Sequence, residues 1–267
     1  MTKGTSFADA AGLSLDWQPA PDENPNRVSS LWIGGPLSNI ELLSIRSFLR
    51  HGHEYWLYSY DPSLAVPAGC RLVDANRILP ESAIFRYADK AGPGRGSVAP
   101  FANLLRYRMM YQTGGWWADT DVICLRPLRF SAALQFGYEN HEIIGCSVLR
   151  SAKGCPVMRK LYEIALAMGQ DLSWGETGPR LVTGVLMHLG LAKNAHPPEV
   201  FYPVPFPDWQ APIVTQLRDA VLRATQNAYT LHLWNEAYRR AAINKFAPFQ
   251  PGTFLDLVDR QCRGEAG

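Results

Sequence analysis

Two aspartates separated by one residue are the clearest candidates for chemistry in this chain. Asp119 and Asp121 lie in the segment GGWWADTDVICLRPL, residues 114–128, whose flanks are apolar and strand-like. In an extended chain, residues i and i+2 project to one side, so the two carboxylates would repel and raise each other's pKa. A divalent cation with oxygen ligands removes that penalty, and it can also neutralise a departing diphosphate. The pair therefore predicts a metal site at the end of a buried strand, where open α/β sheets bind ligands.

The elements that must position this pair begin as strand, helix, strand. Residues 27–35 and 54–60 have the apolar patterns of strands, and residues 38–50 between them have helical spacing. Ser38 is the expected N-cap of this helix, with Glu41 three residues later. This order predicts an α/β domain with a mostly parallel central sheet flanked by helices.

A second helix is expected directly before the two aspartates. It runs from about residue 100 to 112, with a proline in its first turn, and the double glycine at 114–115 ends it. Strand segments at 116–119 and 122–125 then lie on either side of the acids.

The remaining pattern predicts one domain over residues 27–262, preceded by a flexible, polar and proline-rich arm over residues 1–26. Further strands are expected at 134–139, 143–149, 201–204 and 228–234, and further helices at 156–168, 180–190, near 211–223 and close to the end of the chain.

The segment FANLLRYRMMYQTGGWWADTDVICLRPL combines a capped helix, a double glycine, an aromatic pair, a DxD and an apolar strand. It resembles the sugar-binding region of DxD-containing glycosyltransferases, the GT-A-fold enzymes of glycosyltransferase family 32. Their relatives include α-1,4-galactosyl- and N-acetylglucosaminyltransferases and, more distantly, clostridial glucosylating toxins. The segments LWIGG, WGETGP and LHLWNEAY extend the similarity from about residue 27 to 255.

The resemblance implies a GT-A-like nucleotide-diphospho-sugar transferase fold and a metal-dependent glycosyltransferase. The implied reaction is a retaining transfer from a nucleotide-sugar, with a UDP-sugar favoured, to a hydroxyl of a glycan or lipid-linked acceptor. The implied metal is Mn²⁺ or Mg²⁺. The metal and an arginine would stabilise the departing diphosphate while the acceptor hydroxyl attacks an oxocarbenium-like centre. Polysaccharide or glycolipid biosynthesis is the implied setting.

Three residues are the expected metal ligands. Asp121 is expected to be a direct ligand, and the resemblance implies that Asp119 contacts the ribose or donor sugar and also the metal through water. His232 is the third, because a neutral imidazole is a good ligand for Mn²⁺. A packed or surface histidine is the alternative for His232.

Asn103 and Arg106 lie three residues apart, on one face of the helix before the motif. Family relatives often carry SDxLR here, so Asn103 stands where an aspartate would be; it loses a charge and keeps hydrogen-bonding capacity. Both residues are expected to contact the donor, and Arg106 is expected to hold a phosphate or sugar oxygen. The alternative for Arg106 is an ordinary salt bridge to the acidic strand.

Four further side chains are expected around the donor. Trp32 takes the position of a tryptophan that stacks on the uracil, with core packing as its alternative. Trp117 is expected to line the nucleotide pocket, whereas Trp116 should face the core. Trp234 would lie near the diphosphate, where its indole N–H can donate. Glu176 is expected to contact the reacting sugar or the acceptor, with helix capping as the alternative.

Composition excludes several classes. The formal net charge of +2 is too small to favour nucleic acid as a partner. The five cysteines are widely spaced without a CxxC pair, which favours reduced thiols in a cytosolic protein. The N-terminus lacks the apolar core of a signal peptide, and no run is long enough to span a membrane. We therefore expect a cytoplasmic protein, with peripheral association at the inner face of the membrane as a hypothesis.

Three other interpretations remain open from the sequence. The chain could be a catalytically inactive nucleotide-sugar-binding module, which Asn103 leaves open. It could be a DxD-type phosphotransferase, because DTDVI superficially fits a nucleophilic-aspartate loop. It could also be an effector that glucosylates a host protein. The sugar, the acceptor and the oligomeric state are not indicated by the sequence, because epimers differ by only one hydroxyl.

Overall fold

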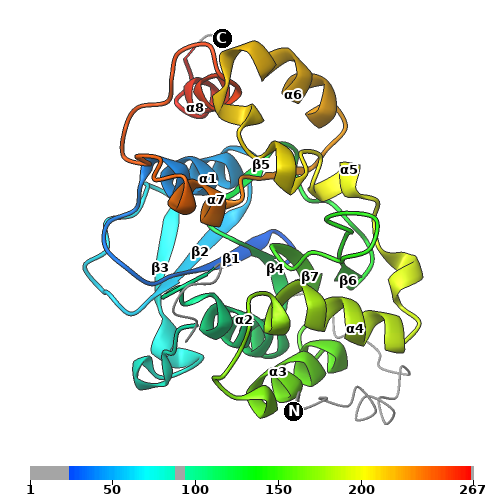
Figure 1. The fold of residues 1–267 in the computed structure, drawn as a ribbon. Helices are drawn as coiled ribbons and strands as arrows, with labels where there is room; N and C mark the ends of the chain where they lie inside the picture. The colour runs from blue at the N-terminus through cyan, green and yellow to red at the C-terminus, as the bar shows by residue number, and fades with distance from the viewer. Residues whose placement is uncertain (1–23, 88–93, 266–267) are drawn as a thin grey trace.

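A computed structural model describes residues 24–87 and 94–265 of the chain, which form two sheets with helices on both faces of the larger one (Figure 1). The larger sheet has six strands in the order β3-β2-β1-β4-β7-β6. Its strands are β1 (Arg27–Trp32), β2 (Glu54–Ser59), β3 (Cys70–Asp74), β4 (Gly115–Ala118), β6 (Leu134–Gln135) and β7 (Val148–Ser151). The smaller sheet pairs β5 (Val122–Cys124) with β8 (Thr230–His232).

The larger sheet is mixed. Strands β3, β2, β1 and β4 are parallel to one another, whereas β7 pairs antiparallel with both β4 and β6. The predicted fold class, an α/β domain with a mostly parallel central sheet flanked by helices, is confirmed.

The strand order changes direction beside the first strand. From β1 the chain moves outward to β2 and β3, and it then returns to place β4 on the other side of β1, with Val28 opposite Trp116. The carboxyl ends of β1 and β4 therefore meet at a switch point, which is where open α/β sheets bind ligands. The two aspartates follow β4 directly.

Helices cover the sheet on both sides (Figure 1). On one side lie α2 (Ala99–Thr113), α3 (Pro156–Met168) and α4 (Leu181–His188), and on the other lie α1 (Asn39–Arg50), α6 (Arg218–Thr225), α7 (Asn235–Arg240) and α8 (Phe254–Cys262). One buried apolar cluster fills the α2–α3–α4 side, a second lies between the sheet and α1, and a third joins α1 to α6, α8 and the small sheet.

Local sequence explains the ends of the helices that lead to the site. Glu41 accepts a hydrogen bond from the backbone N–H of Ser38 at 2.8 Å, as expected for the start of α1. Pro100 lies in the first turn of α2. Gly114 ends α2 at a φ of 64°, and a Cβ there would lie 2.5 Å from the backbone nitrogen of Lys153. Only glycine satisfies both conditions.

Several predicted elements differ from the structure. The strand predicted at 201–204 is wrong, because Phe201 ends the short helix α5 (Pro198–Phe201). The helix predicted near 211–223 is replaced by 3₁₀ turns followed by α6. Pro212, the one proline of this segment, lacks an N–H and favours a short turn at its start. Strand β3 was not predicted, and the strand predicted at 143–149 begins only at Val148.

Of the predicted flexible arm over residues 1–26, only residues 24–26 are described, and they are attached to β2. The backbone N–H of Glu54 donates to the Asn26 carbonyl at 3.2 Å, and Asn24 Nδ2 donates to the Glu54 carboxylate at 2.8 Å. Among the described residues, none of the helices combines the length and the apolar character that crossing a bilayer requires.

Candidate metal and donor site

The two aspartates lie in a tight turn that links the large sheet to the small one. The backbone N–H of Val122 donates to the Asp119 carbonyl at 3.0 Å, closing the turn, and the N–H of Asp119 donates to the Ser147 carbonyl at 2.8 Å. The expectation of a fully extended Asp-Thr-Asp segment is therefore wrong. The chain must turn here because β4 and β5 belong to different sheets.

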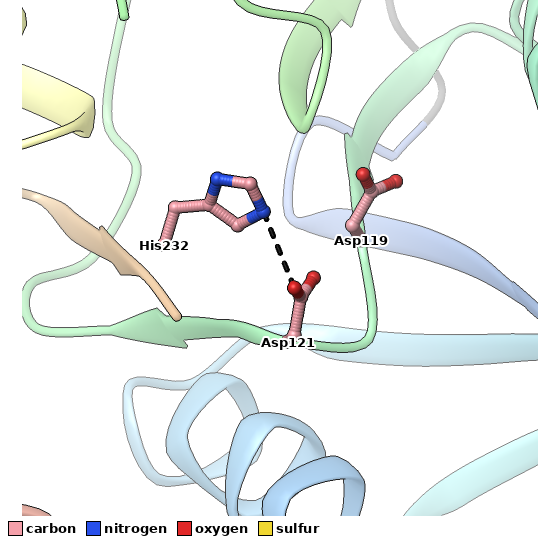
Figure 2. A group of neighbouring side chains, drawn as sticks. All are labelled: Asp119, Asp121 and His232. Carbon is pink, nitrogen blue, oxygen red and sulfur yellow. Dashed lines mark ion pairs between the residues drawn. The ribbon is translucent and has the colours of Figure 1, made fainter. Parts of the chain in front are cut away.

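His232 reaches the aspartates through strand pairing. Strand β8 is antiparallel to β5, with His232 opposite Val122, so the histidine stands beside Asp121 although 110 residues separate them along the chain. One ligand atom from each of Asp119, Asp121 and His232 lies within 4.8 Å of the other two. Figure 2 shows the three side chains around a common space, with the His232 ring directed at Asp121.

Asp119 is held by a buried arginine and an indole. Arg106 Nη2 donates to Asp119 Oδ1 at 2.6 Å, and Trp117 Nε1 donates to the same oxygen at 2.7 Å. The guanidinium also stacks over the Trp117 ring, 4.8 Å from its centroid. The Asp119 side chain remains 28% exposed, against 9% for Asp121, so it is the carboxylate that a ligand entering from solvent can reach.

Asp121 is held from the C-terminal part of the chain. Its Oδ2 accepts a hydrogen bond from the backbone N–H of Asn235 at 2.7 Å and lies 3.3 Å from His232 Nε2. Its backbone carbonyl accepts from the N–H of Leu233 at 2.9 Å. Trp234, between them, has the left-handed conformation with φ 57° and ψ 53°, and this bend follows β8 and begins α7.

Burial and neighbouring charges shift the pKa values of the two carboxylates in opposite directions. Burial raises the pKa of Asp119 and Asp121 adds to this, against the opposing effect of Arg106. Burial acts the same way on Asp121, but the attraction of His232 and the hydrogen bonds it receives leave its pKa lowered. Burial lowers the pKa of His232, and the neighbouring carboxylates more than reverse this. The site therefore concentrates negative charge that a cation would stabilise.

The residues present fit a divalent cation. Two carboxylates and one imidazole suit Mn²⁺, a metal that accepts oxygen and nitrogen ligands. The hydrogen bonds described above fall on Oδ1 of Asp119 and on Oδ2 of Asp121, which leaves the second oxygen of each carboxylate as a ligand. Arg106 Nε and Nη1 are buried and have no hydrogen-bond partner among the described residues. Arg106 thus keeps unused donors beside the acidic pair.

The aromatic pair before the motif divides between the two faces of the sheet, as predicted. Trp116 packs in the cluster on the α1 side, against the rings of Phe130 and Phe201. Trp117 packs in the cluster on the α2 side. Because Trp117 is only 1% exposed, its contribution to the site is the hydrogen bond to Asp119 and the surface beneath Arg106.

Asn103 and Glu176 lie where the WGETGP segment meets α2. Asn103 Nδ2 donates to Thr177 Oγ1 at 3.3 Å, and the Tyr107 hydroxyl donates to the Thr177 carbonyl at 2.7 Å. The Glu176 carboxylate accepts from the backbone N–H of Ser173 at 2.8 Å. In this structure Glu176 therefore ties its own turn, and its contact with a sugar stays a prediction.

The other two tryptophans predicted for the site lie at the end of β1 and two residues after β8. Trp32 Nε1 donates to the Gly35 carbonyl at 2.7 Å, and Lys245 Nζ lies 5.9 Å from the Trp32 ring centroid. The Trp234 ring lies 4.2 Å from that of His232, but its N–H donates to the Val204 carbonyl at 3.1 Å. The indole donor expected to face the diphosphate is thus occupied in this structure.

Three residues of the site were missed by the sequence reasoning. Asn235 donates its N–H to Asp121, Ser147 Oγ lies 3.4 Å from the His232 ring nitrogens, and the Tyr202 ring packs 5.9 Å from the His232 ring. Asn235 follows Trp234 directly, so the HLWN run was an available signal. Ser147 and Tyr202 carried no pattern of their own.

Two glycosyltransferase family descriptions match the chain. "Glycosyltransferase sugar-binding region containing DXD motif" matches residues 46–141, and "Alpha 1,4-glycosyltransferase conserved region" matches residues 169–249. The first contains Asp119 and Asp121, and the second contains His232 and Asn235. The cluster of Asp119, Asp121 and His232 therefore draws its residues from both matched regions.

Known proteins resemble the chain at low identity. Human lactosylceramide 4-alpha-galactosyltransferase is 26% identical over 168 residues, which is 59% of this chain and 46% of that protein. Human alpha-1,4-N-acetylglucosaminyltransferase is 23% identical over 214 residues, 70% of this chain and 61% of that protein. The structure of the PaToxG glycosyltransferase has a TM-score of 0.48 and 16% identity, covering 86% of this chain and 87% of that one.

The alignments thus span roughly half of the length of these curated relatives. The chain thus carries a glycosyltransferase sugar-binding region with a DXD motif and an α-1,4-glycosyltransferase conserved region, and it is similar in sequence to α-1,4-galactosyl- and α-1,4-N-acetylglucosaminyltransferases.

Proposed function

We propose that this chain is a metal-dependent glycosyltransferase that moves a sugar from a nucleotide-sugar, with a UDP-sugar favoured, to a hydroxyl group. The observation that carries the proposal is the cluster of Asp119, Asp121 and His232 beside Arg106, at the switch point of the sheet. Two acids, an imidazole and the buried guanidinium of Arg106 at this edge of the sheet support binding of a diphosphate with a metal ion.

Asp119, Asp121 and His232 would hold Mn²⁺ or Mg²⁺, and the bound cation would neutralise charge on the leaving diphosphate. Arg106 would contribute a second, fixed positive charge through its unused donors. Trp117 and Asn235 keep Asp119 and Asp121 oriented, because each donates a hydrogen bond to one carboxylate. Trp32, at the end of β1, would face the base of the nucleotide.

The finer features of the reaction belong to the same proposal. Transfer would retain the anomeric configuration, and no covalent nucleophile is nominated. The acceptor would be a glycan or a lipid-linked sugar, as the names of the galactosyl relatives suggest. We also propose that the protein is cytoplasmic and associates peripherally with the inner face of a membrane. Sedimentation with acidic lipid vesicles tests this association.

A donor screen by proton NMR tests the proposal. The purified chain is incubated with UDP-glucose, UDP-galactose, their N-acetylated forms and GDP-mannose, with Mn²⁺ or with chelator. We expect slow, metal-dependent release of one sugar, and the first-formed anomer reports the stereochemistry. Asp121→Asn should abolish release, whereas Asp171→Asn, at an exposed aspartate, should not.

The outcomes separate the alternatives. Metal-dependent binding of UDP without turnover of any donor would favour an inactive binding module. Phosphate incorporated onto Asp119 would favour a phosphotransferase. Neither UDP binding nor donor hydrolysis in the presence of Mn²⁺ would refute the transferase proposal.

A further inference from the structure

Glu139 is a third carboxylate whose charge acts on His232, and it lies in a segment that the proposed function does not use. Glu139 lies in a hairpin-like turn between β6 and β7. The N–H of Glu139 donates to the Ile143 carbonyl at 2.8 Å, and the N–H of Gly145 donates to the Gly137 carbonyl at 3.0 Å. Asn140 Oδ1 fixes the tip by accepting from the N–H groups of Glu142 and Ile143, each at 2.9 Å.

The pairing in this turn decides which way Glu139 points. Tyr138 and Ile144 form an antiparallel bridge, and both pack on the cluster of the α2 side. Neighbouring residues of an extended segment project to opposite faces, so Gly137, Glu139 and Gly145 face the other side. The glycines confirm this, because a Cβ at Gly137 would lie 2.8 Å from Phe201 and one at Gly145 would lie 2.4 Å from Tyr202.

That side of the turn leads to the metal cluster. The Tyr202 ring contacts the His232 ring edge-on at a centroid distance of 5.9 Å. Ser147, two residues after Gly145, places its hydroxyl 3.4 Å from the His232 ring. The backbone carbonyl of Ser147 accepts a hydrogen bond from the N–H of Asp119. Glu139 therefore lies on the His232 side of the turn, opposite the α2-side core, and its charge acts on the pKa of His232.

The Glu139 carboxylate is half-buried and makes no hydrogen bond or ion pair with any residue in the described ranges 24–87 and 94–265. Burial raises its pKa, and His232 opposes this. A carboxylate that is withdrawn from water without a partner is costly, and it accepts hydrogen bonds only. A hydroxyl group is the kind of ligand that satisfies it without adding a further charge.

We propose that Glu139 is the residue that binds the attacking hydroxyl, of water or of the acceptor sugar, and takes its proton. This inference rests on the proposed function. In the step, the hydroxyl oxygen bonds to the anomeric carbon of the donor. The bond from that carbon to the diphosphate oxygen breaks, and its electron pair leaves with the diphosphate. The hydroxyl proton moves to the Glu139 carboxylate and then to solvent.

Hydrolysis of the donor tests this role, because water serves as the acceptor and the natural acceptor need not be known. The donor used is the one that the wild-type chain hydrolyses in the screen, with Mn²⁺. We expect Glu139→Gln to lower kcat by about a hundredfold. The donor KM and the Mn²⁺ dissociation constant should stay unchanged within about twofold, since only the attacking group loses its partner.

The same turn supplies a matched control. Glu142 is exposed and three residues away, so Glu142→Gln should keep the wild-type kcat. Glu139→Asp retains a carboxylate and should recover part of the rate, which a purely structural role would not explain. Thermal unfolding checks that each variant is folded.

Other results would overturn the inference. A wild-type kcat in Glu139→Gln excludes the role outright. Weaker Mn²⁺ binding in parallel with the lost rate would make Glu139 part of the metal site instead. A wild-type chain that binds UDP with Mn²⁺ and hydrolyses no donor would refute the proposed transfer and this inference together. If the wild-type chain does hydrolyse a donor, the kcat of Glu139→Gln tests the role of Glu139 alone.

Discussion

At the scale of single residues, the proposed metal site depends on a histidine whose position is set by strand pairing. His232 is buried and lies 3.3 Å from Asp121 through Nε2. Its packing against Trp234 and Tyr202 holds the ring in place. An imidazole held in this way is a ready ligand once a cation displaces its proton, because packing already restricts the side chain before binding.

We therefore expect His232→Gln to weaken Mn²⁺ binding at least about tenfold, or about 1.4 kcal/mol. The amide cannot replace the imidazole nitrogen at the same reach, although it keeps a polar group beside Asp121. Titration of Mn²⁺ by calorimetry measures the change. His188→Gln, at an exposed histidine, is the control. Equal affinity in His232→Gln and wild type would remove His232 from the ligand set.

At the scale of elements, a buried ion pair ties the start of α1 to the C-terminal segment. Glu41 is fully buried, and Lys245 Nζ lies 2.8 Å from its Oε1. Asn39 adds hydrogen bonds from Nδ2 to the carbonyls of Phe246 and Ala247, at 3.0 and 2.9 Å. The segment after α7 is thereby attached beside Trp32, at the end of β1.

Lys245→Met should destabilise the protein by about 3 kcal/mol, because it leaves the Glu41 carboxylate buried without its cation. Urea unfolding measures the loss. Arg159→Met is the matched control, since the Arg159–Glu163 pair of α3 is more than half exposed and contributes at most about 0.5 kcal/mol. A loss no larger than that of the control would show that the buried pair is not needed for stability.

A second element-scale contact depends on pH. His53, at the entry to β2, bridges two segments: Nδ1 lies 3.1 Å from the Asn26 carbonyl, and Nε2 accepts from the N–H of Leu128 at 3.0 Å. This pattern requires a neutral ring that donates through Nδ1 and accepts through Nε2. Burial lowers the pKa of His53 below 6.5, against the opposing hydrogen bond to Asn26.

Lowering the pH should therefore destabilise the fold through His53. Below about pH 6.5 the unfolded chain binds a proton at His53 that the folded chain still excludes. The free energy of unfolding therefore decreases as the pH is lowered through this window, and the full contribution is present above it. We expect His53→Gln to lose less stability than wild type between pH 7.5 and 5.5. Urea unfolding at several pH values gives both slopes, and equal slopes would contradict the neutral assignment.

At the scale of the whole molecule, the proposed metal site joins distant parts of the chain. Asp119 and Asp121 come from the turn after β4, whereas His232 and Asn235 come from β8 and α7. A cation bound here cross-links the large sheet to the small one. Cation binding should therefore raise the free energy of global unfolding as well as support catalysis.

Mn²⁺ at one hundred times its dissociation constant should stabilise the wild-type protein by about 2.7 kcal/mol, and chelator should reverse this. The melting temperature should rise by several degrees. Asp121→Asn should show no Mn²⁺-dependent rise. An equal rise in that variant would mean that the ion binds elsewhere.

Much of the candidate site could be predicted from the sequence, because the part that contains the two aspartates is built from one continuous segment. The helix α2, its glycine end, the opposed faces of Trp116 and Trp117, and the two acids after a buried strand all follow from residue type and spacing within residues 99–121. Helix caps and strand alternation act over a few residues, so one segment carries enough information to place them.

Only the tertiary structure decided the rest. The turn of Asp119 and Asp121 follows from β4 and β5 belonging to different sheets, and the approach of Asn235 follows from the pairing of β8 with β5. Glu139 gained its orientation from the Tyr138–Ile144 bridge and from the rings packed on the neighbouring glycines. Such contacts join residues that are far apart along the chain, and their energy exists only once the sheets have formed. The sequence by itself therefore determined the chemistry of the two acids, and long-range strand pairing decided which residues surround them.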